Sequence, residues 1–270
     1  MTLITSRNNA LICECAKLKD KKYREKTGLF VFEGKKLFFE ALSCEIEFES
    51  IFVTEMGYSL LNDVKKNLPI YIVAQNVYDK LSDDSSPDGI FCVARKPQNT
   101  HKELDDPNDF SPDGQNQSLF MTVSVRDPGN LGTIMRTASA LGIDTLIMSN
   151  DCVDIYNPKT IRSAMGAVFK QKTLRIPDPI EMIKHLNALG FDTYAAALKD
   201  DAKLLSSFEL SKKHCFVAGN EGHGLDDEII DLCTSAVIIP MMPGNESLNV
   251  AGASAILMWE SCKIKNQTND

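Results

Sequence analysis

The stretch that decides the fold is IIPMMPGNESLNVA, residues 238–251. An apolar run enters two prolines and a glycine, and a polar cluster then precedes an apolar segment that continues to Glu260. This order predicts a strand, a turn and a helix, with polar side chains and free backbone N–H groups together where the helix begins. We therefore expect a ligand site at this loop.

Two other loops have the same design. VRDPGNLG (125–132) follows the apolar run 119–125 and leads into a predicted helix, 130–141, that carries Arg136 and stops at Gly142. AGNEGHGL (218–225) follows the apolar run 215–218. Ligands of parallel sheets lie at the carboxyl ends of the strands, so the three loops are expected to meet. The glycines fit neither a dinucleotide-binding loop nor a P-loop, which argues against NAD and ATP.

Strands and helices alternate through residues 119–270, which predicts a parallel sheet covered on both faces. The further strands of this region are expected at 143–148, 168–174, 193–198 and 237–239. The further helices are expected at 158–165, 179–189, 226–233 and 248–262.

Residues 1–96 alternate in the same way and predict a small α/β domain. Its helices are expected at 6–19, after a capping Thr5-Ser6 start, and at 33–42 and 59–66. Its strands are expected at 30–32, 50–54, 70–73 and 90–94. Residues 97–118 are rich in Pro, Asp, Asn, Gln and Gly and poor in apolar residues, so they predict an exposed linker between this domain and a second one, 119–270.

Charge and cysteine usage limit the class of protein. The 270 residues carry a net charge of -8, which argues mildly against a nucleic-acid binder. Residues 1–40 are locally basic, although a solvated helix face explains this feature taken alone. The eight cysteines form no CxxC pair and the four histidines lie far apart, which favours free thiols in a reducing compartment and no metal. No signal-like or membrane-spanning run is present, so we expect a cytoplasmic protein.

Three sequences in order, VRDPGNLGTIMRTASALGI, FVAGNEGHGL and IPMMPGNESLNVAGASAILMWE, closely resemble the signature motifs of the SpoU (TrmH-like) branch of the SPOUT RNA methyltransferases. SRNNALICECAKLKDKKYREKTGLFVFEGKKLFFEAL, residues 6–42, resembles the L30e-like substrate-binding domain found in that family. The resemblance implies a 2'-O-ribose methyltransferase that uses S-adenosylmethionine, with a mostly parallel α/β sheet ending in a trefoil knot. It also implies a homodimer with its site near the subunit interface.

The extra N-terminal domain resembles that of the members that act on ribosomal RNA, so rRNA is the expected substrate. Two alternatives stay open, a tRNA substrate and an RNA-binding or assembly protein of the same fold without catalysis. Methyl transfer to a 2'-oxygen is an in-line attack that needs an aligned donor and acceptor and no metal.

The resemblance also assigns residues to the site. It makes Arg136 the catalytic arginine, with Asn130, Glu221, Ser247 and Asn249 beside it. It places the cofactor against Gly219, Ile239, Met241 and Leu248. An apolar wall with backbone donors and acceptors suits an adenine ring.

Each residue also has a simpler interpretation. Asn130, Ser247 and Asn249 fit helix caps, and Glu221 fits an exposed turn. A guanidinium suits bidentate phosphate contact and hardly gives up a proton in proteins, so orientation and charge stabilisation by Arg136 are favoured over a general base. Other residues near the motifs have simpler expected roles: Asp127 stands where many relatives have Asn, His223 is expected to be a loop residue, and Met242 and Trp259 are expected in the core.

Overall fold

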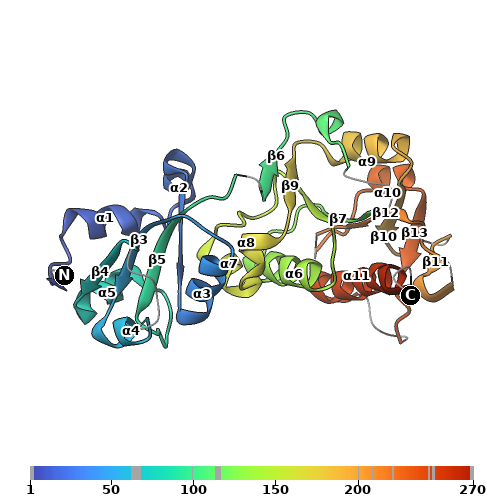
Figure 1. Cartoon of the computed structure of the whole chain (residues 1–270). Coiled ribbons are helices and arrows are strands. Elements are labelled where there is room, and N and C mark those ends of the chain that lie inside the picture. The colour runs from blue at the N-terminus through green and yellow to red at the C-terminus, as the bar shows by residue number, and fades with distance from the viewer. Residues whose placement is uncertain are drawn as a thin grey trace. The chain divides into compact units, whose positions relative to one another are not determined.

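The structure is a computed structural model that describes residues 3–61, 68–98, 100–112, 117–199, 201–207, 209–220, 222–242, 244 and 247–267 (Figure 1). Contacts divide the chain into two units. Unit 1 comprises Met1–Pro97 and Asp154–Phe169, and unit 2 comprises Gln98–Val153 and Lys170–Asp270. Each unit has a sheet of its own.

Unit 1 contains a five-stranded sheet in the order β1-β4-β3-β5-β2. Strands β1, β4 and β3 are parallel, whereas β5 runs antiparallel to both β3 and β2. The strands are β1 Leu3–Ile4, β2 Leu29–Glu33, β3 Phe48–Val53, β4 Ile70–Val73 and β5 Ile90–Arg95. The helices are α1 Ala10–Lys17, α2 Lys21–Thr27, α3 Lys35–Ser43, α4 Glu55–Ser59, α5 Gln75–Leu81 and α7 Pro158–Ala164, followed by α8 Ala167–Lys170.

The segment 154–169 is joined to the rest of unit 1 by aromatic packing and a buried ion pair. The ring of Phe30 on β2 lies 4.8 Å from that of Tyr156, and Phe32 lies 5.1 Å from Phe169. Arg24 on α2 is 2% exposed and its Nη2 lies 2.6 Å from Oδ2 of Asp154. A stretch between two strands of the other sheet therefore completes the core of unit 1.

Unit 2 contains an eight-stranded sheet in the order β11-β13-β10-β12-β7-β8-β9-β6, in which every neighbouring pair is parallel. Its strands are β6 His101–Glu103, β7 Gln117–Thr122, β8 Thr145–Ser149, β9 Thr173–Ile176, β10 Asp192–Ala196, β11 Lys203–Leu204, β12 Lys213–Ala218 and β13 Ser235–Ile238. Its helices are α6 Pro128–Ala140, α9 Pro179–Ala188, α10 Asp227–Leu232 and α11 Val250–Gln267, with 3-10 turns η1 Pro107–Asp109 and η2 Leu205–Ser207. The predicted mostly parallel α/β fold is confirmed.

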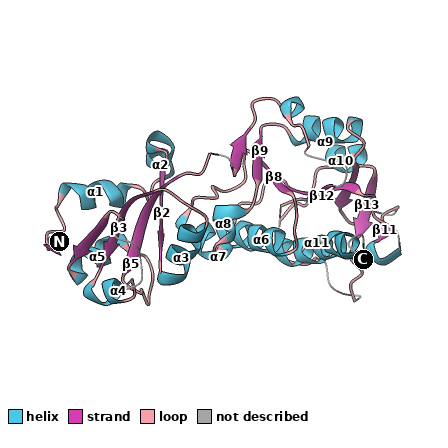
Figure 2. Ribbon diagram, in the orientation of Figure 1, coloured by secondary structure: helices cyan, strands magenta, loops and turns pink. Residues whose placement is uncertain are grey.

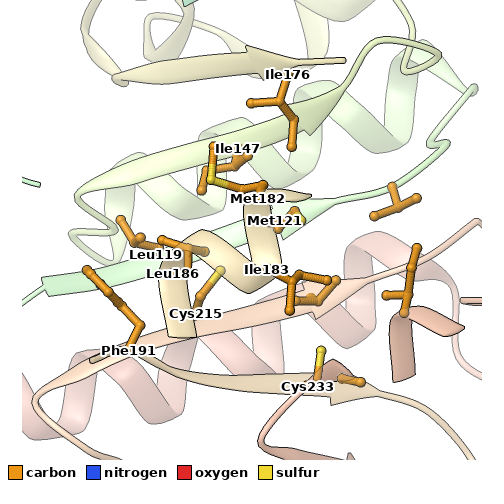
Figure 3. Close-up of a cluster of buried hydrophobic side chains, with 14 of the residues drawn as sticks. Leu119, Met121, Ile147, Ile176, Met182, Ile183, Leu186, Phe191, Cys215 and Cys233 are labelled. Atoms are coloured by element: carbon orange, nitrogen blue, oxygen red, sulfur yellow. The ribbon is translucent and has the colours of Figure 1, made fainter. Parts of the chain in front are cut away.

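Helices cover both faces of the unit 2 sheet, as Figure 2 shows, with α9 and α10 along one side and α6 and α11 along the other. Strand residues alternate between the faces. Leu119 and Met121 of β7 pack with Met182, Ile183 and Leu186 of α9 (Figure 3). Both faces are apolar because both are covered, which accounts for the nearly continuous apolar runs in the sequence.

The predicted linker, 97–118, contributes to unit 2 more than its composition indicates. Strand β6 pairs with β9, and Leu104 and Phe110 pack against the core of unit 2. Edge pairing uses backbone groups, so a polar sequence such as His101–Glu103 can join a sheet without an apolar signal.

Other predictions differ locally. The strand expected at 168–174 is helix α8 followed by β9, because a short apolar run does not distinguish a buried helix from a strand. Helix α1 is capped by Asn9 rather than by Thr5-Ser6. The helix expected at 59–66 falls largely outside the described residues, and α4 ends at Ser59.

Within the described ranges, no group of three or more metal-ligating side chains lies together. No described helix combines the length and apolar character required to cross a bilayer. All eight cysteines are free thiols.

Candidate active site

Three loops follow parallel strands at one edge of the unit 2 sheet. They are 123–127 after β7, 219–226 after β12 and 239–249 after β13. Strand β12 lies between β7 and β10, and β10 is paired with β13. The carboxyl ends of these strands lie at the same edge, as the sequence predicts.

A pocket of about 450 Å³ lies at this edge. It brings together five of the residues assigned from the sequence, namely Gly219, Ile239, Met241, Ser247 and Leu248. The rest of its wall is mostly small or apolar, and it includes Ala196 at the end of β10 with Ala197 and Leu198 directly after it. Sequence reasoning missed these last three, although their strand ends at the same edge.

The glycine loop after β12 is shaped by close backbone contacts. Asn220 and Gly224 exchange backbone hydrogen bonds of 3.1 and 3.0 Å, and Gly224 has φ +71°. A Cβ at Gly219 would lie 2.2 Å from the carbonyl oxygen of Gly224, so no larger residue fits. Glu221, assigned to the site from the sequence, lies outside the described residues. His223 is exposed and lines the pocket.

Asn249 caps helix α11 and reaches the first loop. Its Oδ1 accepts hydrogen bonds from the backbone N–H groups of Ala251, at 2.9 Å, and Gly252, at 3.4 Å. Its Nδ2 donates to Oδ1 of Asn130 over 3.1 Å. Asn249 therefore both caps α11 and contacts the side chain of Asn130.

The expectation that Asn130 caps the helix after the first loop is wrong. Helix α6 begins at Pro128, and its cap is Asp127, whose Oδ1 accepts a 2.8 Å hydrogen bond from the N–H of Asn130. Proline suits the first helical position because its φ is already helical and its missing N–H would have no intrahelical partner. The Asn130 side chain is thereby available to meet Asn249.

Arg136 lies on the exposed side of α6, away from the buried residues Leu131, Ile134 and Met135. It makes no hydrogen bond or ion pair with any residue that the structure describes. Arg126, in the loop before α6, is exposed as well. An exposed guanidinium on the helix that carries Asn130 suits an anionic ligand such as a phosphate.

Two residues expected in the core are exposed. Met242, in the loop between β13 and α11, is 77% exposed, and Trp259 on α11 is 52% exposed. Trp259 follows the exposed Gly252 and Ile256 at helical spacing, whereas the neighbouring Leu257 and Met258 are buried. Residue type alone does not reveal which side of a helix is covered.

The basic N-terminal stretch is partly neutralised. Four of its cations lie within 4 Å of carboxylates, in the pairs Lys17–Glu14, Lys19–Asp83, Lys21–Glu25 and Arg24–Asp154. The interpretation as solvated helix faces therefore holds for Lys17 and Lys21, whereas Lys19 lies in the turn between α1 and α2 and Arg24 is buried.

The fold and the pocket define an α/β protein with a ligand site at the carboxyl edge of a parallel sheet. Residues 117–259, just over half of the chain, match the SpoU rRNA Methylase family, and residues 9–92 match the MRM3-like substrate binding domain. The chain belongs to the SpoU rRNA methylase family. The predicted family and enzyme class are confirmed.

Similar proteins match nearly the whole chain. The 23S rRNA (guanosine(2553)-2'-O)-methyltransferase RlmP of Bacillus subtilis is 29% identical over 259 residues, 96% of this chain and 98% of that protein. The mitochondrial rRNA methyltransferase 3A of Danio rerio is 30% identical over 90% of this chain and 65% of its own length. The crystal structure of an AdoMet-bound rRNA methyltransferase from Sinorhizobium meliloti superposes with a TM-score of 0.82 at 26% identity, covering 97% of each chain.

Proposed function

We propose that this protein methylates the ribose 2'-hydroxyl of a nucleotide in ribosomal RNA, with S-adenosylmethionine as methyl donor. Family membership and the similarity to rRNA 2'-O-methyltransferases support the proposal. The observation that carries it is the hydrogen bond from Asn249 to Asn130, because it joins the loop that walls the pocket to the helix that carries Arg136.

The pocket suits the cofactor. Its volume of about 450 Å³ lies in the range of small-molecule sites, and Gly219, Ile239, Met241 and Leu248 form a wall of apolar groups and accessible backbone. Gly219 lets the chain approach a ligand closely because it has no Cβ. When bound there, S-adenosylmethionine supplies an electrophilic methyl group on a sulfonium.

The side chains near the pocket orient the acceptor. Arg136 offers a fixed positive charge and a planar set of donors for the phosphate next to the target ribose. Asn130, Ser247 and Asn249 supply neutral donors and acceptors for the ribose hydroxyls, and Glu221 completes the proposed set. Holding donor and acceptor in line accounts for a large part of the rate in reactions of this kind.

The proposal divides the chain into a substrate-binding domain, 1–96, a connecting segment, 97–118, and a methyltransferase domain, 119–270. The separate matches to residues 9–92 and 117–259 support this division. RNA would be held through its shape and its phosphates, which suits a protein whose overall charge is negative but whose exposed arginines include Arg126 and Arg136.

The proposal includes three finer features. The protein acts in the cytoplasm, which its free thiols support. Its C-terminal part forms a trefoil knot, as the resemblance implies, in a region of 239–249 that is described only in part. It works as a homodimer, supported by a partly exposed stripe on one face of α11 at Gly252, Ile256 and Trp259, where Ile256 is 38% and Trp259 52% exposed.

Transfer of labelled methyl from S-adenosylmethionine to RNA tests the function. Ribosomal RNA from cells that lack the protein should accept methyl, and Arg136→Ala should abolish transfer while calorimetry shows cofactor binding unchanged. Lys184→Ala, an exposed cation on α9 paired with Glu181, is the matched control and should keep full activity. Methylation found only on tRNA would contradict rRNA as the substrate. Tight cofactor binding without any methyl transfer would contradict methyltransferase activity.

A further inference from the structure

Ser124, between β7 and α6, has a backbone conformation that side chains rarely adopt. Its φ is +58°, in the left-handed region where glycine is preferred. Such residues persist only where their surroundings hold them, and they gather at functional sites. Ser124 also lies at the carboxyl edge of the sheet where the three loops meet.

The groups that hold Ser124 come from the end of β8 with the loop after it, and from the glycine loop after β12. Its backbone N–H donates to Oγ of Ser149, the last residue of β8, over 2.9 Å, and its hydroxyl donates to Oδ2 of Asp151 in the loop that follows. Its carbonyl oxygen accepts a 2.7 Å hydrogen bond from Nδ2 of Asn220, in the glycine loop after β12. Each polar group of this one residue therefore bonds to a neighbouring strand end or loop.

The loop after β8 is itself fixed. Oγ of Ser149 donates to Oδ1 of Asp151 over 2.5 Å. The guanidinium of Arg175 on β9 donates to the carbonyl oxygen of Ser149 at the end of β8 and to those of Asn150, Cys152 and Val153 in this loop, over 3.1 to 3.2 Å. Burial raises the pKa of Asp151, but the hydrogen bonds from Ser124 and Ser149 lower it by more, so the carboxylate stays ionised as their acceptor.

On the other side, Asn220 shapes the pocket. Its Oδ1 accepts a 2.7 Å hydrogen bond from the N–H of Gly222, while its backbone pairs with Gly224. Asn220, Gly222 and Gly224 all line the pocket. A single amide side chain therefore bonds both to the glycine loop and to the carbonyl of Ser124.

We propose that Ser124 and Asn220 are positioning residues that fix the cofactor-pocket loop against the start of α6, so that the pocket and Arg136 keep one relative placement. This inference rests on the proposed function. Neither residue needs to touch the substrate, because Ser124 acts through α6 and Asn220 through the glycine loop. The hydrogen bond from Asn220 to Ser124 is thus a second connection between the pocket and the start of α6, independent of the bond between Asn249 and Asn130.

Asn220→Asp tests the link with little change of shape. The carboxylate keeps an acceptor for Gly222 but loses the donor to Ser124. Asn187→Asp is the matched control, because Asn187 also donates through Nδ2 to a carbonyl, Leu232, at 2.9 Å, and accepts through Oδ1 from Thr193 at 2.8 Å, at a distance from the pocket. Asn220→Asp should weaken binding of S-adenosylmethionine and lower kcat roughly tenfold to a hundredfold, whereas Asn187→Asp should change neither.

Ser124→Ala and Ser124→Gly separate positioning from folding. Both remove the hydroxyl bond to Asp151, but glycine also relieves the left-handed backbone, so the two variants should differ in thermal stability. Both should lower kcat at saturating RNA and cofactor, with the Kd for S-adenosylmethionine changed by less than about twofold. A purely structural role would make activity follow the melting temperature instead, with Ser124→Gly as active as the wild type.

The inference fails if both Ser124 variants retain wild-type kcat, or if Asn220→Asp and Asn187→Asp lose activity equally. A wild-type protein that binds S-adenosylmethionine but transfers no methyl contradicts the proposed function instead. In that case the affinity for S-adenosylmethionine still tests the link between Asn220 and Ser124, because this measurement requires no RNA. The link is supported if Asn220→Asp binds the cofactor more weakly than Asn187→Asp, and it is contradicted if the two bind equally.

Discussion

The side-chain amide of Asn249 donates to Oδ1 of Asn130 over 3.1 Å, across 119 positions of the sequence. The oxygen of the same amide accepts from the first turn of α11. One residue thus combines a helix cap with a contact between two loops of the candidate site, and the two roles can be separated by mutation.

Asn249→Asp should separate them. The carboxylate still caps α11 and adds a charge that the helix N-terminus favours, so the melting temperature should hold or rise. The donor to Asn130 is lost and two oxygens then face each other, so methyl transfer should fall by about tenfold. Differential scanning fluorimetry and the transfer assay measure the two effects.

Asn249→Ala is the companion variant. It removes the cap as well, so it should lower both activity and the free energy of unfolding, the latter by about 0.5–2 kcal/mol. An Asn249→Asp protein with full activity would show that the bond to Asn130 is dispensable.

The buried ion pair of unit 1 should matter for stability. Arg24→Met leaves Asp154, which is 13% exposed, without its cation and should cost about 3–5 kcal/mol. Lys21→Met, on the same helix, breaks an exposed 3.6 Å pair with Glu25 and should cost less than about 1 kcal/mol. Urea unfolding measures both free energies. Equal costs for the two variants would mean that burial of the pair between Arg24 and Asp154 adds nothing to its contribution to stability.

The exposed stripe of α11 should control the oligomeric state. Trp259→Asp and Ile256→Asp place a charge where a second copy is proposed to pack, so light scattering should show half the molar mass of the wild type. Met56→Asp, at an apolar residue of unit 1 that is 59% exposed, is the control and should leave the mass unchanged. A wild type that is already monomeric would contradict the dimer.

Glu33 should make stability depend on pH. Burial raises its pKa above the ordinary 4.5, by more than the hydrogen bond from Ser82 and the charge of Arg162 lower it. The folded state therefore binds the proton more tightly, so the contribution to stability is complete below pH 4.5 and is lost as the pH rises through the raised value.

Glu33→Gln removes this dependence. Relative to the wild type, the variant should gain stability between pH 4 and pH 7 in urea unfolding. Glu47→Gln, at a side chain that is 70% exposed, should show no such trend. If the two variants give parallel curves, burial of Glu33 has no effect on folding.

Sequence reasoning identified the parts that periodicity and turn chemistry encode. The apolar run 119–125 and the stop at Gly142, which has φ +71°, correspond to β7 and to the end of α6. The three loops lie at one edge of the sheet because the carboxyl ends of parallel strands share an edge. The parallel arrangement itself follows from the alternation of strands and helices. Five of the assigned residues consequently line one pocket.

The features that the sequence did not predict have weak local signals or depend on contacts between residues far apart in the sequence. Helix α2, KKYREKT, has no apolar stripe, and its signals were only the cap Asp20 and the left-handed Gly28. Ser124 has an ordinary sequence context, and its role comes from Ser149, Asp151 and Asn220. The start of α6 could have been found, since Asp127-Pro128 is a cap followed by a proline.

The candidate pocket is lined mostly by alanine, glycine and larger aliphatic residues, with few polar side chains, and the backbone of Gly219 lies tightly against that of Gly224. Recognition there depends on the path of the chain more than on the identity of side chains. Conservative replacements such as Ala197→Ser should be tolerated, whereas insertion of one residue between Gly219 and Gly224 would displace several ligand-facing amides at once. Loop length is therefore a stricter constraint on this site than residue identity, which is consistent with a fold shared at 26% identity.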